Sequence, residues 1–174
     1  MDHDHRRSPV LVAAYRLFVV VWLGIALYLP IAFGGGDAGQ RFHTLLRDAP
    51  GQQRSAMTWH PALAEAARRH AAQLAQDGNW SHCDLSGKCA NQYAREAGCN
   101  HGYGGANSVE SLVAGTDDPA VALRALLGSE KHADHLLGRN AFFREQRHVG
   151  VALVSVPGSR FTHYWSIMIA TCRE

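Results

Sequence analysis

The last part of the chain alternates apolar residues with small or polar ones, and this pattern limits the fold more than any other feature. Val149, Val151 and Leu153 alternate with their neighbours, and residues 161–171 alternate again. A Pro-Gly-Ser sequence at 157–159 separates the two stretches and is typical of a turn. A period of two residues predicts β-strands, so we expect an antiparallel hairpin here.

Upstream of this hairpin the apolar residues follow a helical period. Residues 61–76 begin with a proline, which suits the first turn of a helix, and place Leu63 and Leu74 on one face. Asp118, followed by a proline, predicts a second helix start, and Ser129 a third. Helices that precede a terminal hairpin in one small domain indicate an α+β fold built of layers.

An apolar segment lies near the N-terminus. The 24 residues from Val10 to Phe33 contain one charged residue, Arg16, and follow Arg6 and Arg7. Their length suits a membrane-spanning anchor with its positive flank inside. A cleaved signal peptide also fits, because a proline and small residues follow the uncharged core. We favour the anchor; either way, everything after residue 36 is exported, and the domain is secreted if the segment is cleaved.

These features divide the chain into three parts. We expect an N-terminal apolar helix at 1–33, acting as membrane anchor or signal peptide, a short linker at 34–40 and a folded domain at 41–174. Roughly 140 residues are enough to bury a single core. The net charge of +2, with no clustering of basic and aromatic residues after residue 40, argues against nucleic acid as a partner.

Four cysteines lie in the part of the chain that we expect to be exported. Cys83, Cys89 and Cys99 share one loop-rich stretch, and Cys172 lies near the end. An even number of cysteines in an exported domain indicates disulfides, and four cysteines allow three pairings. None has the Cys-X-X-Cys spacing of a zinc site. We favour Cys83–Cys89, which closes a small loop, and Cys99–Cys172, which ties that region to the last strand.

Three polar residues form an ordered series along the domain. His82 follows Trp-Ser, Glu110 is the centre of Val-Glu-Ser, and His132 ends Ser-Glu-Lys-His. His70 stands apart, because it lies on the apolar face of the helix predicted at 61–76. Buried polar groups are usually hydrogen-bonded, so we expect His70 to be a satisfied core residue.

The order of these motifs resembles the CAP superfamily, which comprises the cysteine-rich secretory proteins, antigen 5 and the plant pathogenesis-related proteins and is also called the SCP domain family. Trp-His-Pro-Ala-Leu at 59–63 and Val-Gly-Val-Ala at 149–152 add to the likeness, which is to the bacterial type and covers residues 59–170. The chain departs from the pattern beside Glu110, which lacks the flanking Gly and Asn, and after His132, where Ala133 replaces an arginine.

The resemblance implies a three-layer α-β-α sandwich of CAP type and a cleft that contains His82, Glu110 and His132. The second glutamate of the eukaryotic family members has no clean counterpart, and Glu130 is nearest in sequence to His132, so we place it in the cleft as well. His163 precedes Tyr-Trp and is similar to another family motif, but it follows the Val-Gly strand and therefore lies at the wrong place in the chain order.

Two imidazoles and a carboxylate in one cleft allow several functions. His82 and His132 could bind a divalent metal such as zinc, with Glu110 as ligand or base, in a metal-assisted hydrolase of envelope material. The same three side chains could act as acid and base catalysts, or form an inert network. We favour a non-catalytic binding module whose cleft takes a lipid, glycan or peptide, because no serine or cysteine nucleophile motif is present. No cofactor other than that metal is indicated.

Overall fold

The computed structural model describes residues 35–105 and 107–173. The apolar helix that we expect at the N-terminus lies outside these residues. Within them, none of the helices has both the length and the apolar character that crossing a membrane requires.

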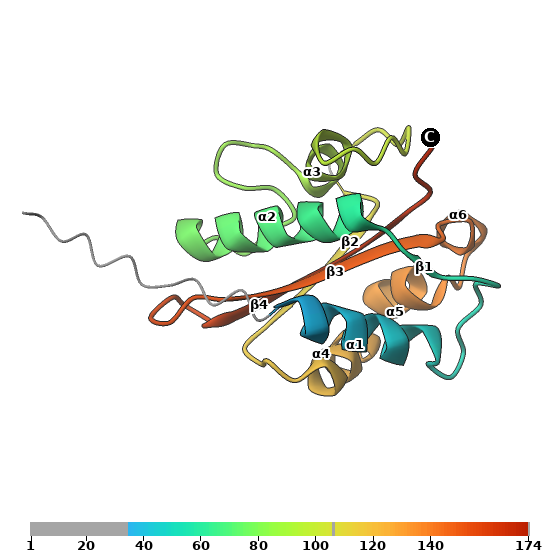
Figure 1. The fold of residues 1–174 in the computed structure, drawn as a ribbon, viewed down its shortest axis with the longest axis horizontal. Coiled ribbons are helices and arrows are strands. Elements are labelled where there is room, and N and C mark those ends of the chain that lie inside the picture. The colour runs from blue at the N-terminus through green and yellow to red at the C-terminus, as the bar shows by residue number, and fades with distance from the viewer. Residues whose placement is uncertain (1–34, 106, 174) are drawn as a thin grey trace, which may run out of the picture.

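The described residues form a four-stranded sheet between two layers of helices (Figure 1). The helices are α1 (Gly35–Arg47), α2 (Pro61–Asp77), α3 (Ala90–Glu96), α4 (Pro119–Leu127), α5 (Glu130–Leu137) and α6 (Ala141–Arg144). The strands are β1 (Thr58–Trp59), β2 (Glu110–Ala114), β3 (His148–Ser155) and β4 (His163–Ala170). α2 and α3 lie on one side of the sheet, and α1, α4 and α5 lie on the other. The predicted α+β class and three-layer arrangement are confirmed.

The strand order is β1-β3-β4-β2. β3 and β4 form the predicted antiparallel hairpin, with His148 opposite Ala170 and Ser155 opposite His163. β1 runs parallel to β3 at one edge. β2, a segment whose short apolar run is compatible with either helix or strand, pairs antiparallel with β4 at the other edge. Glu110 therefore enters the sheet as the first residue of an edge strand.

The helix starts follow the local signals in the sequence. α2 begins at Pro61, and α4 begins after Asp118, whose side chain accepts hydrogen bonds from the amides of Ala120 and Val121. Ser129 occupies the N-cap position of α5, but its side chain makes no capping hydrogen bond. Asp118 therefore caps α4 as predicted, whereas Ser129 directly precedes α5 without capping it.

The predicted linker at 34–40 is wrong, because α1 begins at Gly35. Ala38, Phe42 and Leu46 of α1 are buried in the core between the sheet and α4 and α5. Gly39 permits this close packing, since a Cβ there would lie 2.5 Å from the carbonyl oxygen of Val151 in β3. The glycines that suggest a flexible connection are therefore part of a packed helix.

On the opposite face of the sheet, α2 lies directly against β3. A Cβ added at Gly150 would lie 2.0 Å from the amide nitrogen of Ala64 and 2.6 Å from the Cβ of Leu63. Only glycine leaves room for a helix backbone at this distance. The glycine of the Val-Gly-Val-Ala motif thus sets the spacing between sheet and helix, and with it the position of His70, the α2 residue that contacts Glu110 of β2.

Both predicted disulfides are present. Cys83 is bonded to Cys89, and Cys99 is bonded to Cys172. The first closes the loop that follows α2, and the second links the end of α3 to the segment that follows β4. The loop that carries His82 is therefore fixed at both ends, by α2 and by a covalent bond.

Candidate functional site

Glu110 is the centre of a buried polar network. Its side chain has no exposed surface. One carboxylate oxygen accepts a hydrogen bond from the hydroxyl of Ser166 at 2.6 Å and lies 2.8 Å from Nδ1 of His70. The other oxygen lies 3.0 Å from Nδ1 of His82. An ionised carboxylate only accepts, so both imidazoles donate from Nδ1.

This environment keeps Glu110 ionised. Burial raises the pKa of the carboxyl group, but the hydrogen bonds from His70, His82 and Ser166, together with the charge of His70, outweigh it and hold the pKa below its usual value. Both oxygens are engaged by protein donors. Glu110 is thus a fixed acceptor that orients its neighbours, and it is poorly placed to take a proton from a substrate.

His70 is the buried, hydrogen-bonded residue that its place on the apolar face predicts, but its partner is a member of the site. Its ring is fully buried and stacks on Tyr93, with ring centroids 4.6 Å apart. Tyr93 in turn donates from its hydroxyl to Asp84 at 2.6 Å. His70 therefore connects the core beneath α3 with the carboxylate of Glu110, a role that no motif signals.

His82 is held by the disulfide-closed loop and reaches the network from outside. Its carbonyl accepts a hydrogen bond from the amide of Ala90, and the amide side chain of Asn79 donates to the carbonyl of Cys83. The imidazole keeps 38% of its surface exposed. One ring nitrogen is thus bonded to Glu110, while the opposite edge of the ring remains open.

The third predicted residue, His132, lies near His82. It is half-buried on α5, and its side chain has no hydrogen-bond partner among residues 35–105 and 107–173. Burial, and then the charge of His82, lower the pKa of His132. The ring is therefore neutral at physiological pH, and its nitrogens are available to a ligand.

A second histidine of α5, which no motif singles out, lies deeper. His135 is buried, and its Nδ1 lies 2.8 Å from the hydroxyl of Ser111. Burial, followed by the charges of Arg54 and of the two nearby histidines, lowers the pKa of His135 to about 3. A histidine this resistant to protonation is a weak base, so the pair of Ser111 and His135 does not form an activated nucleophile. The sequence gives one indication that His135 belongs near the site: it follows His132 by three residues on the same helix, which places the two side chains on one side of α5.

A buried arginine fixes the end of α5 and thus both of its histidines. The guanidinium group of Arg54 donates to the carbonyls of His135 at 2.6 Å, Leu136 at 2.7 Å and Gln146 at 2.6 Å. Burial lowers the pKa of Arg54 to about 10, so it stays charged at neutral pH. A cation at the C-terminal end of a helix is also favoured by the helix dipole.

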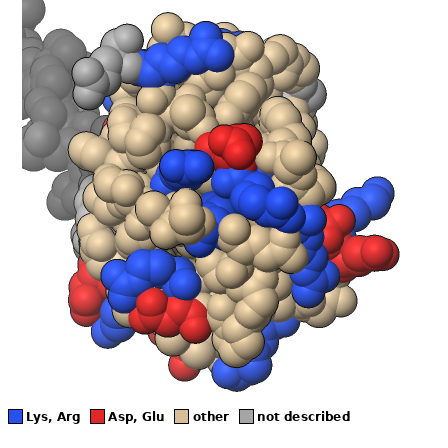
Figure 2. Space-filling model, turned by 90° about the vertical axis from the view of Figure 1, so that its right-hand side faces the viewer, with Lys and Arg blue, Asp and Glu red and all other residues tan. Residues whose placement is uncertain are grey.

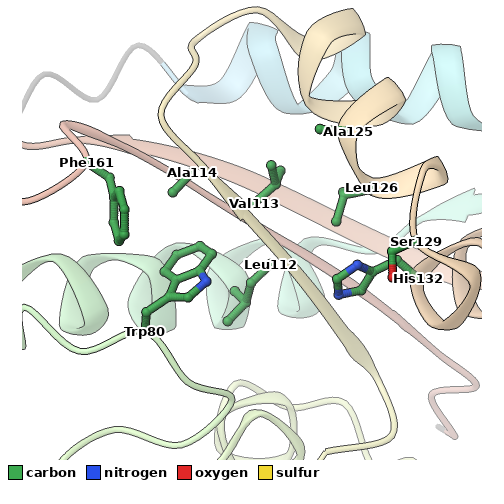
Figure 3. Close-up of a pocket in the computed structure, with 9 residues that line it drawn as sticks. All are labelled: Trp80, Leu112, Val113, Ala114, Ala125, Leu126, Ser129, His132 and Phe161. Atoms are coloured by element: carbon green, nitrogen blue, oxygen red, sulfur yellow. The ribbon is translucent and has the colours of Figure 1, made fainter.

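Two adjoining cavities meet at His132. A polar cavity of about 210 Å³ contains His82, Glu110 and His132 together with Asn107, Ser108, Ser111, Lys131, His135 and Phe143. A mostly apolar groove of about 340 Å³ extends from it along β2, between Trp80 and Phe161 on one side and α4 on the other (Figure 3). We call the two together the cleft; the groove is formed by Trp80, Leu112, Val113, Ala114, Ala125, Leu126, Ser129, His132 and Phe161.

The structure thus brings three of the four predicted cleft residues together. Glu130 is the exception, since it is exposed at the start of α5 and is not one of the residues that form the polar cavity or the groove. It shares a helix with His132, but the helical turn directs the two side chains to different sides. The short distance in sequence between Glu130 and His132 therefore does not place Glu130 in the cleft.

The predicted metal ligands do not form a ready three-ligand site. His82, Glu110 and His132 do not bring three donor atoms within 4.8 Å of one another. In the part of the chain that the structure describes, the group that does so is His60, His148 and Cys172. The sulfur of Cys172 is bonded to Cys99, however, so it offers no thiolate to a metal ion.

Charged side chains of both signs occur together on one face of the molecule (Figure 2). Figure 2 shows one side of the molecule, on which Lys and Arg side chains are interspersed with Asp and Glu. The small net charge of +2 agrees with this distribution. The cleft at β2 is therefore the feature on which a functional interpretation depends.

A family model described as the cysteine-rich secretory protein family, CAP, matches residues 11–169. The chain belongs to this family. The match covers most of the chain and agrees with the predicted resemblance. Among curated protein sequences, none matches this CAP domain significantly.

Solved structures share the fold at low sequence identity. The CAP domain is similar to an outer surface protein from Borrelia burgdorferi, with a TM-score of 0.62 and 14% identity over 79% of this chain and 95% of that one. It is also similar to an extracellular protein containing a SCP domain from Bacillus anthracis, with a TM-score of 0.59 and 18% identity over 78% of this chain and 41% of that one. At such identities the likeness establishes the fold alone.

Proposed function

We propose that this CAP domain is a ligand-binding module, tethered to the outside of the cytoplasmic membrane, whose cleft takes a lipid, a glycan or a peptide. The observation that carries the proposal is the position of His132. It lies where the polar cavity meets the apolar groove, and its ring has no partner among the described residues. A half-buried polar group without a partner is unfavourable, and a ligand that bonds to it removes that cost.

The cleft suits a ligand with one polar end and one apolar part. The open edges of His82 and His132 and the ammonium group of Lys131 offer hydrogen-bond donors in the polar cavity. The groove offers Trp80, Leu112 and Leu126 to an apolar group. Pockets of a few hundred Å³ with apolar walls and a few convergent polar groups are typical ligand sites.

Three observations support a location outside the membrane. The apolar segment from Val10 to Phe33 provides an export or anchoring signal, and all four cysteines form disulfides, which persist in oxidising compartments. The two similar structures described above are named as an outer surface protein and an extracellular protein.

A metal-assisted hydrolase is supported less well by the geometry. Both oxygens of Glu110 already accept hydrogen bonds, and the three candidate ligands are not assembled around one point. Metal analysis of the purified protein separates the two functions. One zinc ion per chain that is lost in a His82→Ala, His132→Ala double variant would support the hydrolase and contradict our proposal.

The test of the proposal is a binding panel with matched variants. The full chain, purified in detergent, is titrated with short-chain phospholipids, soluble peptidoglycan fragments and hexapeptides with a free carboxyl group. We expect one class to bind, and Trp80→Ala to weaken it at least tenfold, because Trp80 forms one wall of the groove. Val121→Ala is the control, since Val121 is exposed to a similar extent, 40% against 36%, but does not contact the groove. If no class binds, or if both variants bind like the wild type, the proposal fails.

A further inference from the structure

β2 is an edge strand, and its outer side has no neighbouring strand among the described residues. In an antiparallel pair, alternate residues bond to the partner strand and the others direct their amides and carbonyls outward. The carbonyl of Val109 accepts from the amide of Ile169, and the amide of Gly115 donates to the carbonyl of His163. The odd-numbered residues of β2 thus pair with β4, and the even-numbered residues face outward.

The outward amide and carbonyl of Glu110 are already hydrogen-bonded, to the side chain of Asn107. Nδ2 of Asn107 donates to the carbonyl of Glu110 at 3.0 Å, and its Oδ1 accepts from the amide of Glu110 at 2.9 Å. A residue of a neighbouring strand would make the same two bonds. The amides and carbonyls of Leu112 and Ala114 make no hydrogen bond within residues 35–105 and 107–173. Two consecutive outward positions are therefore open.

The groove beside this open edge has two unlike walls. Leu112 faces Trp80 and Phe161, whereas Val113 points to the opposite side of the sheet, toward Leu126 of α4 (Figure 3). A strand added to β2 would direct its own side chains alternately to the same two walls. The groove thus combines what strand addition needs, which is unpaired backbone groups for affinity and alternating contacts for selectivity.

We propose that β2 binds an extended peptide as an additional antiparallel strand, with the C-terminal carboxylate of the peptide in the polar cavity beside His132. The proposal rests on the proposed function, because it names the ligand class of the same cleft. The direction follows from the position of the donors. His82, Lys131 and His132 gather near the first residues of β2, so a carboxylate held there makes the peptide run opposite to β2.

The carboxylate in question is that of a chain end. A terminal carboxylate carries a full charge and two acceptor oxygens, and the polar cavity of about 210 Å³ offers donors from His82, Lys131 and His132 to bind it. The carboxylate of Glu110 does not repel it strongly, because that charge is already engaged by His70, His82 and Ser166.

Other occupants of the edge fit less well. An acyl chain would bury the amides and carbonyls of Leu112 and Ala114 without partners, which is unfavourable. A second copy of this chain would have to bring its own β2 to about 4.8 Å, the spacing of paired strands. In each copy β2 lies between Trp80 and α4 (Figure 3), so these walls would have to pass one another before the two strands could pair.

The experiment uses the full chain and a combinatorial library of hexapeptides with a free carboxyl group. Affinities of selected peptides are measured by fluorescence anisotropy. We expect the carboxamide form of a selected peptide to bind at least tenfold more weakly. We also expect N-methylation of the peptide to weaken binding about tenfold at every second residue, because only alternate amides donate to β2. N-methylation at the residues between them is the matched control.

Ala114→Pro tests the protein side, since it removes an outward amide and leaves the bonds to β4 in place. We expect a folded Ala114→Pro chain to bind at least tenfold more weakly; if it does not fold, the N-methyl series decides alone. Equal effects of N-methylation at all positions would overturn strand addition. A dimer of the full chain that persists at saturating concentrations of the selected peptides, and that Ala114→Pro dissociates, would also overturn it, since a second copy would then occupy the edge. If a lipid or glycan binds and no peptide does, this inference fails while the proposed function stands; if nothing binds, both fail.

Discussion

Nδ1 of His70 and Oε1 of Glu110 lie 2.8 Å apart, although 40 residues separate them and neither side chain is exposed. The contact joins the centre of α2 to the first residue of an edge strand. It divides the histidines near Glu110 by role. His70 holds the carboxylate from the core, His82 holds it from the loop, and His132 is left to face the cleft.

Glu110→Gln should lower the free energy of unfolding by about 2–3 kcal/mol, because the side chain loses the charge that strengthens three hydrogen bonds and presents an amide group to an N–H donor. Urea denaturation of the full chain measures the change. Glu145→Gln is the control, since that side chain is 75% exposed, and it should stay within about 0.5 kcal/mol of the wild type. Equal stability of the two variants would show that the network does not support the fold.

His135 should make the domain sensitive to mild acid. Its pKa is about 3 in the folded state against 6.5 for an ordinary histidine, so below pH 6.5 the unfolded chain takes up a proton that the folded chain does not. This contribution to stability is complete above pH 6.5 and decreases as the pH falls, by at most about 1.4 kcal/mol per pH unit.

The measurement is the free energy of unfolding between pH 6.5 and pH 5, for the wild type and for His135→Asn, which keeps an acceptor near Ser111. Other buried histidines contribute to both curves, so the informative quantity is the difference in slope. We expect a shallower slope for His135→Asn. Parallel curves would mean that His135 titrates normally in the folded protein.

Arg54→Lys should destabilise the domain by about 2–4 kcal/mol, although the charge is retained. Lysine cannot bond simultaneously to the carbonyls of His135, Leu136 and Gln146, which the planar guanidinium group joins. Arg124→Lys, on the exposed side of α4, is the matched control and should be nearly neutral. A small effect at Arg54 would indicate that the end of α5 is held by its other contacts.

Gly150→Ala should destabilise the domain by more than about 4 kcal/mol or prevent folding, because a Cβ at 2.0 Å from the backbone of α2 forces helix and sheet apart. Gly104→Ala tests whether adding a methyl group is harmful in general. No atom lies within 4 Å of a Cβ at that position, and its backbone conformation suits alanine. Soluble yield and thermal unfolding distinguish the two, and similar behaviour would contradict the close packing of α2 on β3.

The sequence predicts well what depends on neighbours in the chain. The β3–β4 hairpin follows from alternation around Pro-Gly-Ser, and the start of α4 follows from Asp118 and Pro119. The disulfides follow from four cysteines, of which two lie six residues apart. Each of these features is set by local geometry or by a small number of possible pairings.

The sequence predicts poorly what depends on packing. Residues 35–40 contain several glycines and form a helix because Ala38 fits the core and Gly39 lets α1 approach β3. His70 and His135 enter the site because α2 and α5 pack on opposite faces of the sheet (Figure 1), which no local pattern specifies. Glu130 leaves it because the turn of α5 directs its side chain to solvent. The chain order does bring together His82, Glu110 and His132, which line one polar cavity in the structure.

The most direct test compares the stability and the ligand affinity of His132→Ala in the same samples, by thermal unfolding and by titration with the ligand that the panel identifies. His60→Ala serves as the control, because His60 is also half-buried but lies beside β1, at the opposite edge of the sheet. We predict that His132→Ala melts within about 2 °C of the wild type, since the His132 side chain makes no hydrogen bond to the described residues, and binds at least tenfold more weakly. A His132→Ala chain that melts much lower and binds its ligand with unchanged affinity would contradict the assignment of His132 to the ligand.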